Sequence, residues 1–133
     1  ALMNFGARLG ACQEAIELLS RKGFKITLVD ARFAKPFDKN LMDNILDNHK
    51  YVLTIEEGSI GGFSSIVLDY IHNKRKKNTF STVKNLIFPD KFIDHNSPGN
   101  QYKEIGMDAE SIEKKILSII VSKDIDLKTI ENI

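Results

Sequence analysis

The sequence of 133 residues has no tryptophan, one cysteine, three prolines and three histidines. The single cysteine, Cys12, excludes an intrachain disulfide and a zinc site built from cysteines of this chain, and it favours a reducing compartment. No apolar run approaches the roughly 18 residues that would cross a bilayer. The chain also opens without the pattern of a secretory signal peptide. We therefore expect no membrane contact.

The chain also lacks an excess of either charge, because it has 19 basic and 18 acidic residues and a formal net charge of +1. No global field favours nucleic acid, and we expect no nucleic-acid partner. The one basic cluster covers residues 74–77 and follows a predicted helix, where cations stabilise the negative end of the helix dipole. We interpret it as a solvated linker, with contact to a polyanion as the alternative.

The chain begins with Ala-Leu-Met-Asn-Phe, which is typical of a strand interior and lacks an initiator methionine. True N-termini commonly carry a disordered tail, so we expect a fragment of a longer protein. We expect one domain over residues 1–121 and a C-terminal tail over residues 122–133. Three interpretations of that tail stay open: a further helical turn, a linker or an expression remnant.

Strand and helix patterns alternate along the chain. Apolar and β-branched runs predict strands over residues 2–5, 24–30, 50–56 and 81–88. Apolar spacing predicts helices over residues 7–22, 38–49, 63–71 and 108–122. Asp38 and Asp108 are the expected N-caps of two of these helices, and residues 90–101 have the chemistry of turns. The alternation predicts an α/β fold, a three-layer sandwich with a mainly parallel sheet.

Residues 54–71 are the most informative stretch, with a buried strand, a turn of two acids and three glycines, and then a helix. The turn residues are Glu56, Glu57, Gly58, Gly61 and Gly62. Adjacent residues of a strand point to opposite faces, so the two glutamates are poorly placed as an acid/base pair. A carboxylate at the helix N-terminus is stabilised by the dipole and repels phosphate. Self-capping is therefore our interpretation, and a phosphate site is the alternative.

Other candidate residues follow the strands, where open α/β sheets usually bind ligands. Asp30 and Arg32 follow the second strand and predict an ion pair that ties the strand end to its loop, with substrate contact as the alternative. His95 follows an aspartate in the loop after the last strand. The three histidines have no spacing typical of a metal site. No G-x-S-x-G motif supports an esterase-like nucleophile.

Five segments in order resemble the C-terminal domain of the 1-deoxy-D-xylulose-5-phosphate synthase family. They are residues 4–6 (NFG), 29–38 (VDARFAKPFD), 54–63 (TIEEGSIGGF), 89–95 (PDKFIDH) and 106–110 (GMDAE). The first three would fit any transketolase-like C-terminal domain, and the last two favour the synthase. The resemblance covers about residues 2–120. Ser64 and Asn96 depart from it, since small or glycine residues are common at those positions.

The resemblance implies a parent enzyme similar to transketolase. Such a synthase condenses pyruvate with glyceraldehyde 3-phosphate and releases carbon dioxide, as the entry step to non-mevalonate isoprenoid synthesis and a supply for thiamine synthesis. It uses thiamine diphosphate and magnesium, which the N-terminal and central domains hold. The family occurs in bacterial cytoplasm and in plastid-type organelles.

For this chain the resemblance implies support of the architecture and of a homodimer, with no activity and no bound cofactor on its own. No catalytic, cofactor-binding or metal-binding residue is carried over. The glycine-turn residues, with Asp30, Arg32 and His95, are candidates for an interface or a structural turn. Two alternatives stay open: a free-standing α/β anion-binding module, and the C-terminal domain of a 2-oxoacid dehydrogenase β subunit.

Overall fold

A four-stranded, all-parallel sheet organises the computed structural model, which describes the backbone of residues 1–130 and the side chains of residues 1–122. The strands are β1 (Leu2–Phe5), β2 (Leu28–Asp30), β3 (Tyr51–Glu56) and β4 (Thr82–Leu86), in the spatial order β2-β1-β3-β4. Leu2 is in register with Leu28 on one side and with Leu53 on the other. Because parallel neighbours need long crossover connections, helices follow the strands along the chain.

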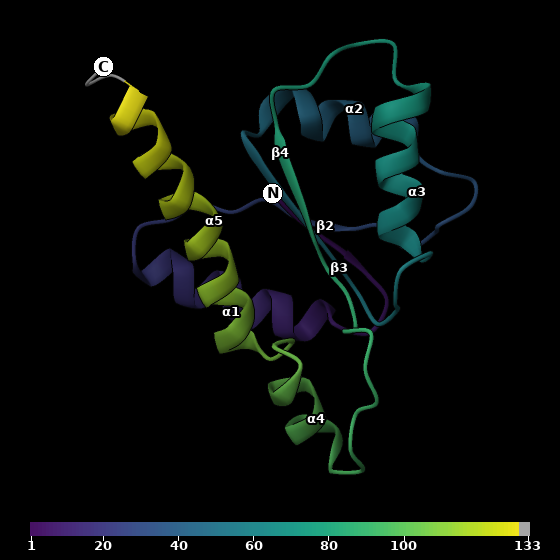
Figure 1. Ribbon diagram of the computed structural model, residues 1–133, viewed down its shortest axis with the longest axis vertical. Coiled ribbons are helices and arrows are strands. Elements are labelled where there is room, and N and C mark those ends of the chain that lie inside the picture. Colours follow the sequence, from purple (N-terminus) through teal and green to yellow (C-terminus); the bar gives the residue numbers. More distant parts are fainter. Residues whose placement is uncertain (131–133) are drawn as a thin grey trace.

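Helices cover both faces of this sheet (Figure 1). One face carries α1 (Leu9–Arg21) and α5 (Ala109–Ile130). The other carries α2 (Lys39–Asn48) and α3 (Phe63–Asp69), which continues as the π-helical turn η1 (Tyr70–Lys74). The short helix α4 (Pro98–Glu104) lies beyond the carboxyl end of the sheet. The predicted three-layer α/β fold is confirmed.

Two hydrophobic cores lie on opposite faces of the sheet because successive strand residues point to opposite sides. Leu2 and Leu53 join the core under α1 and α5, whereas Met3 and Val52 join the core under α2 and α3. All residues of β3 except Tyr51 are buried. Burial on both faces is typical of a parallel strand and explains why this segment reads as a continuous apolar run.

Most predicted elements are confirmed, with boundaries that differ by a few residues. Both aspartate caps are present: Asp38 Oδ1 accepts a hydrogen bond from Leu41 N at 2.9 Å, and Asp108 Oδ1 accepts one from Ser111 N at 3.1 Å. None of the helices in the described part of the chain has both the length and the apolar character needed to span a membrane.

Two predicted boundaries are wrong. The strand expected over residues 24–30 is limited to Leu28–Asp30, because Phe24 and Ile26 pack against the core under α1 and α5 without joining the sheet. The turn segment expected over residues 90–101 contains the start of α4. Ser97, which caps the N–H of Asn100, followed by Pro98 at the first helical position, was the signal for that helix.

The last helix also runs further than expected, since α5 continues to Ile130 and so includes most of the predicted tail. Residues 131–133 of that tail lie outside the described residues. The division into a domain of residues 1–121 and a tail of residues 122–133 stays a prediction.

The thiol of Cys12 provides a test of the core under α1. It is fully buried, and burial raises the pKa of Cys12 to about 12. Because the thiolate is the reactive form, we expect an aromatic disulfide reagent to leave the folded protein unlabelled at neutral pH and to label it at once after unfolding in guanidinium. Rapid labelling of the folded protein would contradict this packing.

Candidate functional site at the carboxyl edge of the sheet

Glu56 caps the helix that follows its own strand. Glu56 is the last residue of β3, and it is buried, with 4% of the residue exposed. Oε2 accepts a hydrogen bond from Phe63 N at 2.7 Å, and Oε1 accepts one from Ser64 N at 2.8 Å. These are two of the four N–H groups that the first turn of a helix leaves unpaired. The carboxylate therefore satisfies both donors and lies at the positive end of the helix dipole, as the self-capping interpretation requires.

The glycines of this turn make room for that carboxylate. A Cβ on Gly62 would lie 2.3 Å from Glu56 Oε2, and a Cβ on Gly58 would lie 3.0 Å from the same atom. Gly61 has a φ of 102°, a backbone conformation that side chains disfavour. The pattern of glycines after the two acids is thus explained by the close approach of Glu56 and by one positive φ.

The turn has no N–H group to offer an anion between residues 61 and 64. Gly61 N donates to Ser65 Oγ at 2.9 Å and Gly62 N donates to the Ser59 carbonyl at 3.2 Å, while the next two N–H groups are bonded to Glu56. A phosphate would have to displace these partners and face a buried carboxylate. The residues of the turn therefore do not fit a phosphate or the diphosphate of a cofactor.

Glu57 belongs to a second polar cluster, which the sequence did not reveal. Its side chain is 27% exposed, accepts a hydrogen bond from the Tyr102 hydroxyl and lies 3.8 Å from Arg8 Nη1. The Arg8 guanidinium in turn lies over the Tyr102 ring, with Cζ 3.6 Å from the centroid. The hydrogen bond to Glu57, together with desolvation, raises the pKa of Tyr102.

This cluster joins three segments that are far apart in the sequence: the β1–α1 connection, the β3–α3 turn and α4. Helix α4 has no buried residue of its own, so polar contacts hold it. Besides Tyr102, it is tied by an ion pair between Lys91 Nζ and Glu104 Oε1 at 3.3 Å. Neither Arg8 nor Tyr102 stands in a local motif, and only the fold brings them together.

The remaining candidates at this edge stay apart from the cluster. Arg32 Nε lies 3.4 Å from Asp30 Oδ2 in an exposed ion pair, which is the predicted tie between strand end and loop. His95 is exposed in the connection between β4 and α4. Among the described side chains, no hydrogen bond or ion pair links Asp30, Arg32 or His95 to Glu57. In the same part of the chain, no group of three or more histidines, cysteines or acids is placed to hold a metal ion.

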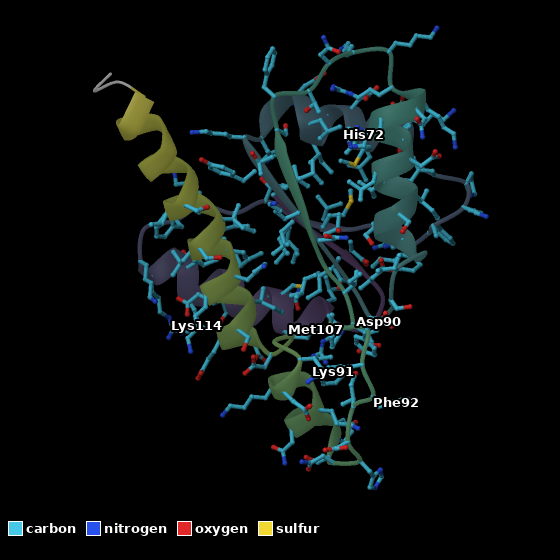
Figure 2. The ribbon with its side chains drawn as sticks, in the orientation of Figure 1. His72, Asp90, Lys91, Phe92, Met107 and Lys114 are labelled. Atoms are coloured by element: carbon cyan, nitrogen blue, oxygen red, sulfur yellow. The ribbon has the colours of Figure 1, made fainter. Side chains whose placement is uncertain are left out.

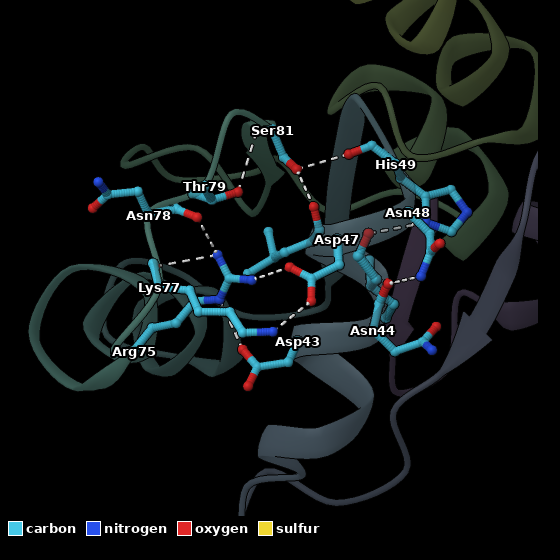
Figure 3. A network of polar contacts seen from close by, with 12 residues as sticks. Asp43, Asn44, Asp47, Asn48, His49, Arg75, Lys77, Asn78, Thr79 and Ser81 are labelled. Carbon is cyan, nitrogen blue, oxygen red and sulfur yellow. Dashed lines mark hydrogen bonds and ion pairs between the residues drawn. The ribbon is translucent and has the colours of Figure 1, made fainter.

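Within the basic run of residues 74–77, the three lysines are exposed, but the interpretation as a solvated linker is wrong for Arg75. The Arg75 side chain is 1% exposed, with Nε 2.8 Å from Asp43 Oδ1 and a second hydrogen bond to Asp47 (Figure 3). Its Nη1 donates to the Asn78 carbonyl at 2.9 Å. Lys77 Nζ lies 3.2 Å from Asp47 Oδ2. Arg75 and Lys77 therefore fasten the loop after η1 to α2.

The fold is a three-layer α/β domain. At its carboxyl edge, Glu56 caps the helix that follows β3 and so occupies the strand-to-helix turn. Residues 1–112 match the family described as transketolase, C-terminal domain, and the chain belongs to that family.

A solved structure described as a split gene transketolase, an inactive beta4 tetramer, is similar in fold. It aligns with a TM-score of 0.72 over 88% of this chain, at 21% sequence identity. The chain spans 36% of the length of that protein. The family match of residues 1–112 confirms the resemblance at the level of transketolase C-terminal domains, and the solved structure supports the fold.

We predict that the replacement of Glu56 by alanine lowers the free energy of unfolding by about 1–2 kcal/mol, because two buried N–H groups lose their acceptor. Glu56→Gln keeps one carbonyl acceptor and should lose less. Ser59→Ala, in the same turn but away from the carboxylate, is the matched control. Urea unfolding followed by circular dichroism measures all three, and equal stability of wild type and Glu56→Ala would contradict the capping role.

The Arg75 network predicts a loss of stability in acid. The hydrogen bond from Arg75 lowers the pKa of Asp43 below its usual value of 3.8. A carboxylate with a lowered folded-state pKa stabilises the protein above the unfolded pKa, and this stabilisation is lost as the pH falls through the folded pKa. Urea unfolding from neutral to acidic pH should therefore show stability declining below about pH 4.

Asp43→Asn should be less stable than wild type at neutral pH and should show a shallower decline in acid. Asp90→Asn, at an exposed position outside the network, serves as the control. Parallel pH profiles for wild type and Asp43→Asn would show that the Arg75 pair adds no stability.

Proposed function

We propose that the chain is the C-terminal domain of a thiamine diphosphate-dependent 1-deoxy-D-xylulose-5-phosphate synthase, in which it supports assembly and performs no catalytic step. The match of residues 1–112 supports the transketolase part of this proposal. The segments 89–95 and 106–110 support the synthase. The first connects β4 to α4, and the second contains Gly106 with a φ of 73°, the buried Met107 and the cap Asp108.

The observation that carries the supporting role is the capping of α3 by Glu56. The Glu56 carboxylate accepts hydrogen bonds from two backbone N–H groups, so it is not available for general acid/base chemistry. Thiamine diphosphate and magnesium would accordingly be held by other domains of the parent enzyme. The parent would act in a bacterial cytoplasm or a plastid-type organelle.

Exposed apolar side chains at the carboxyl edge support a partner there. Phe33, Ile60 and Phe92 are 68%, 79% and 102% exposed, and they lie in the loops that follow β2, β3 and β4. Figure 2 shows Phe92 in the lower part of the view, close to Asp90 and Lys91. Large exposed apolar side chains are informative because folding normally buries them. We propose that this edge faces the N-terminal and central domains, or the second subunit of a homodimer.

A second candidate is the C-terminal domain of a 2-oxoacid dehydrogenase β subunit. It is compatible with residues 4–6, 29–38 and 54–63, which would fit any transketolase-like C-terminal domain, and with the family match. The two candidates differ in the parent reaction, since a dehydrogenase oxidises the 2-oxoacid and a synthase joins it to an aldehyde.

The test is an assay of the parent polypeptide that carries this chain, with pyruvate, glyceraldehyde 3-phosphate, thiamine diphosphate and magnesium. We expect 1-deoxyxylulose 5-phosphate and carbon dioxide in equal amounts, and no product from the 133-residue chain alone. Oxidative decarboxylation of a 2-oxoacid without condensation would overturn the synthase proposal. Tight thiamine diphosphate binding by the isolated chain in a calorimetric titration would overturn the supporting role.

A further inference from the structure

Arg32, in the connection between β2 and α2, has a backbone conformation that its own domain does not explain. Its φ is 53°, and among the residues that the structure describes no other residue except glycine has a positive φ. Phe33 N donates a hydrogen bond to the Ala31 carbonyl at 2.5 Å, so Arg32 is the central residue of a three-residue turn. Such a turn with a positive central φ is rare and strained, and glycine would adopt it at a lower cost.

Both ends of this turn are held on the core, so Arg32 and Phe33 project from it. Ala31 N donates to a carbonyl of β1 at 2.8 Å, and Ala31, Ala34 and Phe37 pack against the core under α2 and α3. Between these anchors the Arg32 side chain is 74% exposed and Phe33 is 68% exposed. In the view of Figure 1 the connection, drawn in dark blue, swings out beyond α3 before α2 begins.

The contacts of Arg32 within the domain are too weak to account for the strain. Its only described polar partner is Asp30, with Nε 3.4 Å from Oδ2. An exposed ion pair contributes little to stability. The pair engages Nε and leaves Nη1 and Nη2 of Arg32 without a described partner. A strained residue that its own fold does not use is typical of a site where another molecule is bound.

The charges near Phe33 in the sequence are mainly positive. Lys35 and Lys39 are exposed, and no hydrogen bond or ion pair is described for either side chain. The two acids of the segment are engaged locally, one by Arg32 and the other, Asp38, as the cap of α2. An exposed aromatic ring beside an arginine is the composition of the residues that dominate protein interfaces. The segment therefore fits a partner surface that is apolar at its centre and acidic around it.

We propose that Arg32 and Phe33 dock this domain onto another domain of the parent polypeptide, with the Phe33 ring in an apolar hollow and the Arg32 guanidinium on a carboxylate at its rim. The inference rests on the proposed function, in which the chain supports assembly. The chain spans 36% of the length of the similar solved protein, so most of that protein lies outside the matched part. A small anion fits the site less well, because Asp30 lies beside the guanidinium and the next side chain is apolar.

Arginine modification by phenylglyoxal, followed residue by residue in mass spectra, tests the contact. In the 133-residue chain alone, Arg32 should react at a rate close to that of the exposed Arg21 of α1, and the buried Arg75 should stay unmodified. In the parent polypeptide, Arg32 should react about tenfold more slowly, because modification must wait for the interface to open. Arg21 should keep its rate there.

Variants separate the interface from the stability of the domain. In the parent, Phe33→Ser should return the rate of Arg32 modification to within about twofold of the rate in the isolated chain. Phe80→Ser, which changes another exposed phenylalanine in the loop before β4, should leave the protection unchanged. In the chain alone, Arg32→Gly should lower the equilibrium constant for unfolding in urea about threefold, because glycine relieves the strained φ.

Equal reactivity of Arg32 in the isolated chain and in the parent would overturn the proposal. A higher unfolding constant for Arg32→Gly would also overturn it, because the arginine would then serve its own domain. Protection of Arg32 in the isolated chain by inorganic phosphate would assign the site to a small anion instead. Protection that grows with the concentration of the isolated chain would assign it to a second copy of the domain.

The product assay of the parent is read separately from the modification of Arg32. A parent that forms no 1-deoxyxylulose 5-phosphate but protects Arg32 would refute the synthase and support the docking contact. A parent that forms this product while Arg32 reacts as in the isolated chain would support the synthase and refute the docking contact.

Discussion

The paired hydrogen bonds from the N–H groups of Phe63 and Ser64 to Glu56 are the constraint on which the carboxyl edge depends. They tie the end of the central strand β3 to the start of α3, so the direction of the chain between the two is fixed. The close approach requires that Gly62 carries no side chain. Once the carboxylate lies there, Glu57 points the other way and becomes available to Arg8 and Tyr102. The buried Glu56 thus shapes the turn, and its neighbour Glu57 contributes one of the contacts that hold α4.

The same interaction decides what this edge can do. In many open α/β sheets, the free N–H groups after a strand receive a ligand. Here the protein supplies its own anion, and the turn is a joint whose donors are already engaged. The carboxyl edge instead presents apolar side chains in its loops, which fits a surface that meets other parts of a larger enzyme better than a self-contained site.

The amino edge is held by a different kind of interaction. The buried Arg75 guanidinium binds two carboxylates of α2 and the carbonyl of Asn78 in the following loop, so the connection into β4 is fastened at that end. A buried cation of this kind requires several partners at once, because an unpaired charge in the interior is costly. One residue of a four-residue basic run therefore has a structural role that the composition of the run does not indicate.

The sequence by itself determined the alternation of strands and helices, the aspartate caps and the family, since these depend on local periodicity and on short ordered segments such as residues 54–63. It also indicated, through the repulsion between a glutamate and phosphate, that the glycine turn is a structural joint. Only the tertiary structure decided that Glu57 meets Arg8 and Tyr102 and that Arg75 is buried. These features join residues that are far apart along the chain, and the packing of the helices on the sheet, which no local pattern encodes, sets the distances between them.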